Sequence, residues 1–516
     1  MKTRKVSALL LAFVMLAVFI AACTDGAAPG DTAPPAADDT PVADGNDTPA
    51  ADDQPDTDEP PADDDIITLV IAFPGAASEA EAAVMEAVNA QLISDGYNFN
   101  VEILYFDDFF TQLPLTIAGG EVIDLAWSHF NHLGNMVRMN VLQPIDDALA
   151  SHGPVLLAHT PEFLMMGGSI GGVQYAMPRV VPMSYHRNVL NIRGDIRESH
   201  GIPPITTLDH LEAFLQAVTE YEDDMYGIIG WLPDVFSPVY LNAHMLIEWI
   251  VYATPDDPTV HSLWHSDEMS AMMERIWRWS QNGWIPPQEV IDRLDGGDAG
   301  FDHGFVAAVT ANAMRASERI DFFTHNVPEG TVETVLLLPD RSWNFFAGDN
   351  ALAVPTTSNN VNEAVAFVNW LKSTQENFDL FSFGIEGVNY TLVDGGVDTS
   401  IGTGENNFSM HSWMWDDLRL NRFSANFSQA DIDQLMVWDD AAEISPYLGF
   451  VFDQDPVSTQ MGMLSSVVWG NMGQWNNGQF EFAPDRDRFL GELEAAGLQD
   501  VLDEAQRQLD AFMAGR

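Results

Sequence analysis

The stretch IITLVIAF at residues 66–73 marks where the folded part of this chain begins. It is short, apolar and rich in β-branched side chains, which is typical of a strand buried on both faces of a sheet. A Pro-Gly turn follows, and Ser78 lies three residues before Glu81, which is the spacing of a helical capping box. Apolar residues then recur at helical spacing between positions 80 and 92. The stretch therefore predicts a buried strand followed by a helix.

The same alternation of elements continues to residue 127. Residues 101–105 carry apolar side chains at every second position, as a half-buried strand does. We expect a helix over residues 108–118, which Pro114 should kink or shorten, and a strand over residues 122–127. This order of strands and helices predicts a parallel sheet covered by helices on both faces.

Later segments repeat the pattern in a chain that is too long for one ordinary domain. The chain has 516 residues, which is enough for two lobes with separate cores. The other predicted elements are a helix capped by Thr207, strands at 306–310 and 335–338, a helix capped by Ser358 or Asn359, and two amphipathic helices at 485–495 and 499–514.

The N-terminus predicts export and a lipid anchor. Basic residues precede the apolar run 9–20, which is too short to span a membrane as a mature helix. The run ends in IAAC at residues 20–23, which resembles a bacterial lipobox, so we expect residues 1–22 to be a lipoprotein signal peptide and Cys23 to be acylated. Cys23 is the only cysteine of the chain, so no internal disulfide can form. The alternative is an ordinary signal peptide in which Cys23 occurs by chance.

The segment that follows Cys23 predicts a linker. Residues 24–66 consist mainly of Ala, Asp, Pro, Thr and Gly and contain no Lys or Arg, so they cannot bury a core. The aspartates are best explained by solvation; calcium binding is a weaker alternative, because no loop of alternating oxygen ligands is present. The formal net charge of -56 repels nucleic acid and anionic lipid headgroups, so we expect no nucleic-acid partner.

Four motifs resemble those of the family 1 extracellular solute-binding proteins, the maltodextrin-binding protein group. They are GGEVIDL at 119–125, VLQPIDD at 141–147, GVQYAMP at 172–178 and FDHGFVAAV at 301–309. Three C-terminal motifs resemble a subgroup, the LipO-like lipoproteins, whose C-terminal region has no characterised function. They are FGIEGVNY at 383–390, GFVFD at 449–453 and EAQRQLD at 504–510. The resemblance covers residues 67–516 in order.

The resemblance implies an α/β, two-lobed periplasmic-binding-protein-like fold. Each lobe would be a doubly wound mixed sheet, a hinge would join the two, and a ligand would bind in the cleft between them. We expect an N-terminal lobe of residues 67–178 plus about 345–395, and a C-terminal lobe of about 182–340 plus about 396–516. The first crossover would lie at 178–182 and the return crossover between 339 and 348.

The resemblance also implies a function. It predicts a monomeric, lipid-anchored substrate-binding protein on the extracellular face of the bacterial cell membrane, which captures an oligosaccharide and delivers it to the permease of an ABC transporter. The alternatives are a surface-anchored glycoside hydrolase and a peptide-binding or adhesive lipoprotein. The sequence contains no His-Glu-x-x-His motif or phosphate loop, so we expect no enzyme, no cofactor and no metal site.

Candidate ligand-binding residues follow the predicted strands and crossovers, since ligands of doubly wound sheets lie beyond the carboxyl ends of the strands. They are Trp127, Ser128, His129 and Asn312 at strand ends, Tyr185 and Arg187 after the first crossover, and Trp231, Trp343, Phe345 and Trp413 in loops. Packing in the core is the alternative for Trp127 and Trp231, and a structural ion pair is the alternative for Arg187. Trp413 and Trp415 are alternatives for the same role. Only one of the two can face the core if the segment is extended, and the other would then be free to contact the ligand.

The aromatic residues favour a neutral oligosaccharide over other ligands. Flat aromatic rings match the apolar C–H faces of sugars, and Asp, Asn and Glu accept hydrogen bonds from hydroxyl groups. An acidic cleft disfavours an anionic ligand, because burying like charges together is costly. A cationic peptide remains the alternative.

Overall fold

The computed structural model describes residues 66–184, 189–222, 224–233, 241–293, 298–337, 343–344, 347–440 and 442–515. The predicted lipidation site Cys23, the linker, and the candidate residues Tyr185, Arg187 and Phe345 lie outside these ranges, as does most of the predicted return crossover. No helix within the described ranges combines the length and apolar character needed to cross a bilayer.

The first lobe is built on a mixed five-stranded sheet in the order β2-β1-β3-β15-β6. β1 runs parallel to β2 and β3, as the sequence predicts, while β15 runs antiparallel to both β3 and β6. The bounds of the strands are β1 Ile67–Pro74, β2 Phe99–Phe106, β3 Leu125–His129, β6 Ala176–Pro178 and β15 Asn350–Ala353. The antiparallel strand β15 makes the sheet mixed, because the chain returns to this lobe from the second one.

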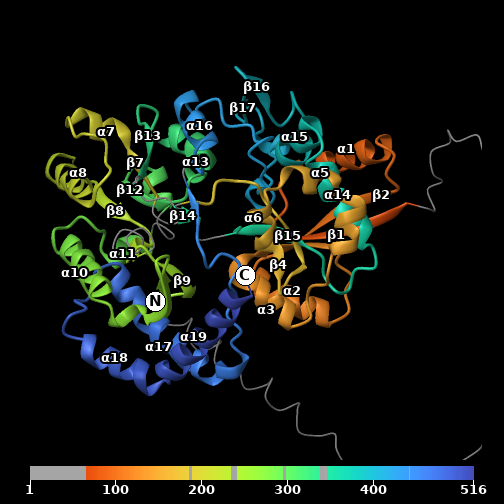
Figure 1. Cartoon of the computed structure of the whole chain (residues 1–516). Helices are drawn as coiled ribbons and strands as arrows, with labels where there is room; N and C mark the ends of the chain where they lie inside the picture. The colour runs from red at the N-terminus through yellow and green to blue at the C-terminus, as the bar shows by residue number, and fades with distance from the viewer. Residues whose placement is uncertain are drawn as a thin grey trace, which may run out of the picture. The chain divides into compact units, whose positions relative to one another are not determined.

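Helices cover both faces of this sheet, as Figure 1 shows for α1 and α15 above β1 and for α2 and α3 below it. Leu69, Ile71 and Phe73 point to one face and share a core with α1, α4, α14 and α15. Ala72 and Ala126 point to the other face and pack against α2 and α3. The bounds of the helices are α1 Glu81–Ser94, α2 Phe109–Ala118, α3 Phe130–Arg138, α4 Asp146–His152, α5 Pro154–His159, α14 Val361–Leu371 and α15 Gln375–Phe383.

The predicted capping box at the start of α1 is wrong. The N-cap position is Ala80, which makes no side-chain cap hydrogen bond. The hydroxyl of Ser78 is buried without a hydrogen-bond partner among the described residues. The Glu81 carboxylate instead accepts a hydrogen bond from the hydroxyl of Tyr105 on β2 at 2.6 Å, so this residue is used by the neighbouring strand and not by the cap.

The second lobe contains a four-stranded sheet in the order β13-β7-β12-β8. β12 runs parallel to β8 and antiparallel to β7, so this sheet is also mixed. The predicted cap of α8 is confirmed, since the hydroxyl of Thr207 accepts a hydrogen bond from the backbone N–H of His210. The bounds are β7 Val189–Arg193, β8 Tyr226–Ile229, β12 Val306–Ala311, β13 Val332–Leu336, α7 Gly194–Ser199, α8 Leu208–Tyr221, α10 Asp267–Gln281, α13 Arg315–Asn326 and α16 Gln429–Met436.

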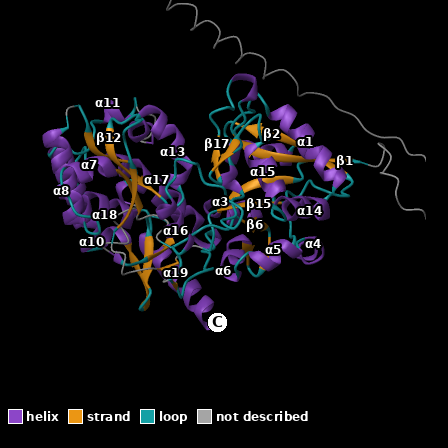
Figure 2. Ribbon diagram, turned by 90° about the horizontal axis from the view of Figure 1, so that it is seen from above, coloured by secondary structure: helices purple, strands orange, loops and turns teal. Residues whose placement is uncertain are grey.

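A second, three-stranded sheet and three C-terminal helices complete the second lobe (Figure 2). Their apolar side chains join the core of α8 and α10, where the ring of Trp264 lies 4.9 Å from that of Phe489. The last two helices lie where the sequence predicts amphipathic helices. The bounds are β9 His244–Ile247, β10 Val251–Thr254, β11 Asp257–Ser262, α17 Ser458–Asn476, α18 Arg486–Ala495 and α19 Leu498–Ala514.

The chain passes between the lobes at three described segments, which we call the crossovers: residues 179–184, 347–350 and 415–420. The backbone N–H of Arg179 donates to the carbonyl of Asn350 at 3.0 Å, and Val180 pairs with Asp417. The side chains of Phe408, Met410, Met414, Trp415 and Leu420 lie in the core of the first lobe, although the sequence prediction assigns residues from about 396 onward to the second lobe.

Lys372 lies buried beside these crossovers with 2% of its surface exposed. Its ammonium group donates a hydrogen bond to the carbonyl of Pro178 at 3.2 Å. Burial lowers the pKa of Lys372 to about 8, although the carboxylates of Asp417 and Asp416 act in the opposite direction. The amine therefore binds the backbone at the start of the first crossover and is not offered to solvent.

Candidate functional site

Aromatic side chains gather at the carboxyl ends of β1 and β3 in the first lobe. Trp127, near the end of β3, is half-buried, and its ring lies 4.7 Å from Phe110 and 5.3 Å from Trp413. The rings of Trp127 and Trp413 meet edge to face at 87°. The indole Nε1–H of Trp127 donates to Oδ1 of Asn350 at 2.9 Å. Two of the predicted aromatic residues therefore form one cluster.

Histidines extend this aromatic cluster toward the second lobe. His129 caps α3 by accepting a hydrogen bond from the backbone N–H of Asn131, and its ring lies 4.6 Å from that of Phe130. His132 stacks on Phe110 with ring centroids 3.7 Å apart. Burial lowers the pKa of His132, and the carboxylate of Glu248 in the second lobe opposes this effect. The lowered pKa favours the neutral form of the His132 ring, which offers a flat face and a polar edge.

Trp415 occupies the core position that competes with Trp413. It is 1% exposed, stacks on Phe73 at 5.3 Å, and donates its indole N–H to the hydroxyl of Ser382 at 3.1 Å. Trp413 is half-buried at the edge of the same core. Trp413 is therefore the member of this pair that reaches the aromatic cluster.

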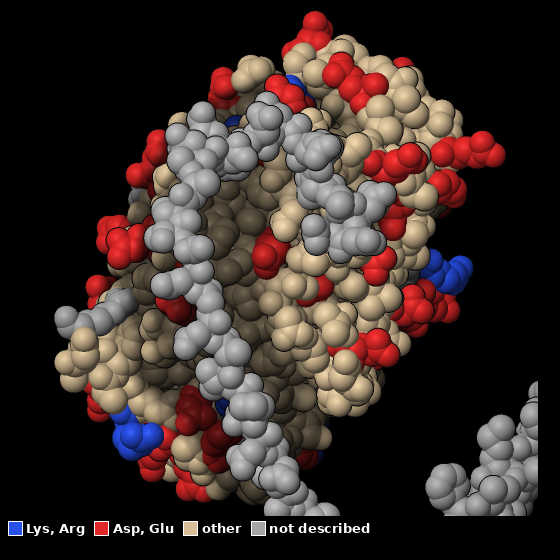
Figure 3. Space-filling view, turned by 90° about the vertical axis from the view of Figure 1, so that its right-hand side faces the viewer, with Lys and Arg blue, Asp and Glu red and all other residues tan. Residues whose placement is uncertain are grey.

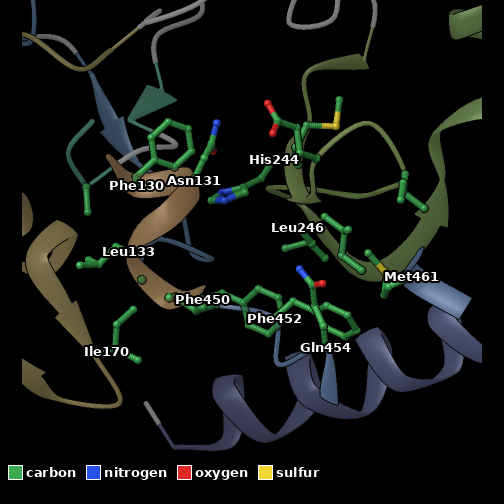
Figure 4. Close-up of a pocket in the computed structure, with 18 of the residues that line it drawn as sticks. Phe130, Asn131, Leu133, Ile170, His244, Leu246, Phe450, Phe452, Gln454 and Met461 are labelled. Carbon is green, nitrogen blue, oxygen red and sulfur yellow. The ribbon is translucent and has the colours of Figure 1, made fainter. Parts of the chain in front are cut away.

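A pocket of about 600 Å³ adjoins the cluster and is lined by both lobes. In Figure 4, Phe130 and Asn131 face His244 on one side of it, while Leu133 and Ile170 face Phe450 and Phe452 on the other. The second lobe also supplies Leu246, Glu248, Gln454, Met461, Ser465 and Trp469 to the lining. Among the described residues that line it, Glu248 is the only one of the Asp, Glu, Lys or Arg type, so this described lining offers no Lys or Arg to pair with an anionic ligand.

The second lobe contributes one tryptophan to the described lining of this pocket, and two more lie close to it. Trp469 on α17 is 51% exposed and lines it. Trp231 is half-buried, with its ring 6.0 Å from Trp469 and 6.0 Å from Trp249. Trp249 has a φ of 59°, which a bulky residue seldom adopts and which often marks a functional loop. The predicted residue Trp231 thus packs against Trp469, and Trp469 is the one that lines the pocket. The sequence prediction did not include Trp469.

His244 is a buried polar group of the pocket. It is 8% exposed, and its Nδ1 shares a hydrogen bond with the hydroxyl of Ser445 at 2.9 Å. Burial lowers the pKa of His244 to about 4, so the ring is neutral at pH 7. A neutral imidazole can donate or accept one hydrogen bond but brings no charge into the pocket.

None of the described candidate residues belongs to the pocket lining, and three of them also lie away from its aromatic neighbours. Ser128 is 1% exposed and faces the sulfur of Met136 in the core. Asn312 accepts a hydrogen bond from the backbone N–H of Met314 at 3.0 Å, which organises the start of α13. Trp343 lies in the short strand β14 (Trp343–Asn344), which pairs with β18 (Glu443–Ile444). The side chain of Asn312 therefore has a structural partner, and the backbone of Trp343 is held in a strand pair.

The missed residues share a signal that is visible in the sequence. Ser458, Met461, Gly462, Ser465 and Trp469 fall on one face of α17. A large aromatic residue on a face of small side chains indicates an open surface and not a packed one. Glu248 and Asn131 have no comparable signal in the sequence, because they line the same pocket only through the way in which the two lobes pack. Within the described part of the chain, no group of three or more His, Cys, Asp or Glu residues could hold a metal ion.

Comparison with known proteins agrees with this architecture. Residues 83–386 match the family described as bacterial extracellular solute-binding protein. The chain belongs to this family. In this solute-binding protein, residues 446–514 also match a domain of unknown function, DUF3502, which corresponds to the C-terminal region without characterised function predicted from the sequence.

Relatives of this solute-binding protein come from several bacteria. A carbohydrate ABC transporter substrate-binding protein of Streptococcus pneumoniae serotype 4 is 20% identical, over 82% of this chain and 86% of the relative. The N-glycan transport solute-binding protein NgtS of Streptococcus pneumoniae has a similar structure, with a TM-score of 0.72 and 16% identity over 87% of this chain and 99% of NgtS. An ABC-transporter-associated solute-binding protein of Bifidobacterium longum infantis, described as HMO-binding, has a TM-score of 0.57 and 15% identity over 87% of this chain and 99% of that protein. These likenesses support the predicted two-lobed α/β fold.

Proposed function

We propose that this solute-binding protein captures a neutral oligosaccharide between its two lobes and delivers it to the permease of an ABC importer. The observation that carries the proposal is the pocket of about 600 Å³, which both lobes line and which has aromatic rings in each wall. Exposed rings such as Trp469 match the C–H faces of sugars. The aromatic cluster around Trp127 and Trp413 extends this surface along the first lobe.

The polar groups of the pocket suit hydroxyl groups better than charged ones. Asn131 and Gln454 each offer an acceptor and a donor, and His244 is neutral. The part of the lining that the structure describes has no Lys or Arg, and acidic side chains far outnumber basic ones on the face that Figure 3 shows. An anionic sugar would lose its hydration without gaining a cationic partner, so we favour a neutral ligand.

The names of the relatives support a carbohydrate. NgtS has been solved in complex with Man1GlcNAc and with Man5GlcNAc, and this chain aligns with 99% of that structure in each case. The curated relative is named for carbohydrate transport. At 16% to 20% identity these names support the class of ligand and not its structure.

The remaining parts of the proposal concern where the protein works. We propose that Cys23 carries the lipid anchor, that residues 24–66 act as a spacer, and that the protein acts as a monomer on the extracellular face of the cell membrane. These inferences rest on the lipobox at residues 20–23 and on the composition of the linker. The permease would be the protein partner.

A glycoside hydrolase is disfavoured by the carboxylates of the pocket. Such enzymes ordinarily place two carboxyl groups on either side of the scissile bond. Among the residues that line the described pocket, only Glu248 carries a carboxylate. A binding protein that releases its sugar unchanged fits this lining better.

Two measurements on the purified full chain test the proposal. Native mass spectrometry of the freshly isolated protein should reveal a bound oligosaccharide, and a glycan array should identify neutral sugars that bind. Incubation of a bound sugar with the protein should return it intact. A blank glycan array together with binding to a library of cationic peptides would replace the sugar by a peptide, and cleavage of the sugar would make the protein an enzyme.

A further inference from the structure

A continuous series of polar contacts links the aromatic cluster to the crossovers. Nε1–H of Trp127 donates to Oδ1 of Asn350 at 2.9 Å. The amide nitrogen Nδ2 of the same Asn350 donates to Oδ2 of Asp349 at 3.1 Å. The Asp349 carboxylate also accepts two hydrogen bonds from the guanidinium of Arg179, one of them from Nε at 2.7 Å. One side chain, Asn350, therefore stands between an indole ring and a buried ion pair.

The series returns to the aromatic cluster on the other side. Nη1 of Arg179 donates to the backbone carbonyl of Trp413 at 3.0 Å. The ring of Trp413 in turn meets the ring of Trp127 edge to face at 5.3 Å. The contacts thus form a closed circuit through Trp127, Asn350, Asp349, Arg179 and Trp413.

This circuit includes residues of two described crossovers and contacts the third through Arg179. Arg179 lies in the first, Asp349 and Asn350 lie in the second, and Asp416 of the third lies 3.7 Å from Nη1 of Arg179. Arg179, Asp349 and Asp416 are 2%, 4% and 4% exposed. Buried charges are costly unless they keep their partners, so the three crossovers are held at fixed positions relative to one another.

We propose that Asn350 is a positioning residue that ties the orientation of the Trp127 indole to the arrangement of the crossovers. The amide does this because its two ends serve different groups, the indole N–H and the Asp349 carboxylate. If the Trp127 indole rotates, Asn350 must either lose the hydrogen bond from the indole N–H or turn with it and lose its hydrogen bond to Asp349. Both bonds are kept only if the second crossover moves together with the indole. The inference rests on the proposed function only in that Trp127 is taken as a ligand contact, so that a sugar stacked on the ring acts on the hinge between the lobes.

The test uses the full chain without ligand, so its outcome does not depend on which solute the protein binds. Spin labels on Leu115→Cys in the first lobe and Tyr221→Cys in the second report the distance between the lobes in a Cys23→Ser background. Both positions are exposed, at 68% and 62%. Asn350→Leu removes both ends of the amide, and Trp127→Phe removes the indole donor while keeping an aromatic ring.

Each of these variants should broaden the distribution of inter-lobe distances, and the double variant should broaden it no further than Asn350→Leu alone. The indole N–H of Trp127, labelled with ¹⁵N, should exchange with solvent about tenfold faster in Asn350→Leu, as expected for the loss of a hydrogen bond. Trp370→Phe is the matched control, because Trp370 is also buried and donates its indole N–H to a side-chain acceptor, Asp95, but within the first lobe and outside the crossovers. It should lower stability and leave the distances unchanged.

Distances that stay unchanged in Asn350→Leu and Trp127→Phe would overturn the proposal. So would an equal broadening in Trp370→Phe, since that would be a general effect of destabilising the first lobe. A failure of the glycan array would leave these distance measurements intact and would affect the proposed function alone.

Discussion

The rings of Trp231 and Trp469 lie 6.0 Å apart with their planes at 36°, although one follows β8 and the other belongs to a C-terminal helix. Trp231 is half-buried against the core, while Trp469 is 51% exposed and reaches the pocket. The inner ring thereby supports the outer one. The C-terminal segment of unknown function thus supplies part of the ligand-binding surface that we propose.

Replacing Trp469 by Ala should weaken binding of the sugar identified on the array by about two- to tenfold, the amount associated with one aromatic contact. The melting temperature should change little, because about half of the ring is exposed in the free protein. Phe480→Ala is the control, since Phe480 is 53% exposed and does not line the pocket. Isothermal titration calorimetry measures both variants, and equal affinities would place the sugar elsewhere.

Filling the pocket from α17 should also reduce binding. Gly462 lines the pocket, and a Cβ added there meets no atom within 4 Å, so Gly462→Leu should project into the cavity without straining the helix. Affinity should fall about tenfold because the sugar and the new side chain compete for space. Stability should be unchanged or slightly higher, since Leu is the better helix former.

Gly470→Leu is the matched control for that experiment. Gly470 is on the same helix, also has free space around its Cβ position, and does not line the pocket. Its substitution should leave the affinity at the wild-type value. A loss of binding in both variants would point to the helix as a whole and not to the pocket.

The buried ring of His244 should make stability depend on pH. The unfolded chain takes up a proton at this residue near pH 6.5, whereas burial lowers the pKa in the folded protein to about 4. The contribution of His244 is therefore fully present above pH 6.5 and is lost as the pH falls toward 4. Urea unfolding at pH 7, 6 and 5 should show wild type losing stability relative to His244→Asn, by up to roughly 3 kcal/mol over the whole window. Parallel curves for the two proteins would contradict the lowered pKa.

The lipid anchor predicts a specific effect of Cys23→Ala. This variant should be neither acylated nor cleaved by the lipoprotein signal peptidase, because the thiol that takes the lipid is gone. Mass spectrometry of membrane-extracted wild type should find acyl chains at Cys23. An unmodified Cys23 in the mature protein would show that the signal peptide is an ordinary one.

Salt should stabilise the folded part of the chain. Beyond residue 66, acidic residues exceed basic ones by about 45, and the acidic groups in Figure 3 are spread over a face with few cations. Screening of this repulsion should raise the melting temperature between low salt and about 1 M NaCl. A flat or falling trend would mean that local ion pairs already balance the acids.

The sequence is most informative where a single element determines the outcome. The strand at residues 66–73, the Thr207 cap and the last two helices can be predicted because hydrophobic periodicity and local hydrogen bonds specify them. The pairing of Ser78 with Glu81 fails for a tertiary reason, since Tyr105 on another strand takes the carboxylate. Local spacing cannot reveal a competitor that is close only in the fold.

The candidate site is less predictable because it is made from both lobes. Trp127 and Trp413 follow from strand ends and loop aromatics, and the structure places them in one cluster. Asn131 and Glu248 become neighbours of one pocket only through the arrangement of the lobes. Trp127 also carries a hydrogen bond to Asn350, so Trp127→Ala should lower stability as well as binding.

The burial of Lys372 has a chemical consequence for a protein that we propose to bind sugars. Reducing sugars condense with exposed lysine amines through their aldehyde form and slowly modify proteins that stay in contact with them. Lys372 is the only lysine after position 5, and its amine is held against the Pro178 carbonyl with 2% of the residue exposed. The folded surface beyond the linker therefore presents no lysine for such glycation, and amine-directed dyes or cross-linkers should label this region only after it unfolds.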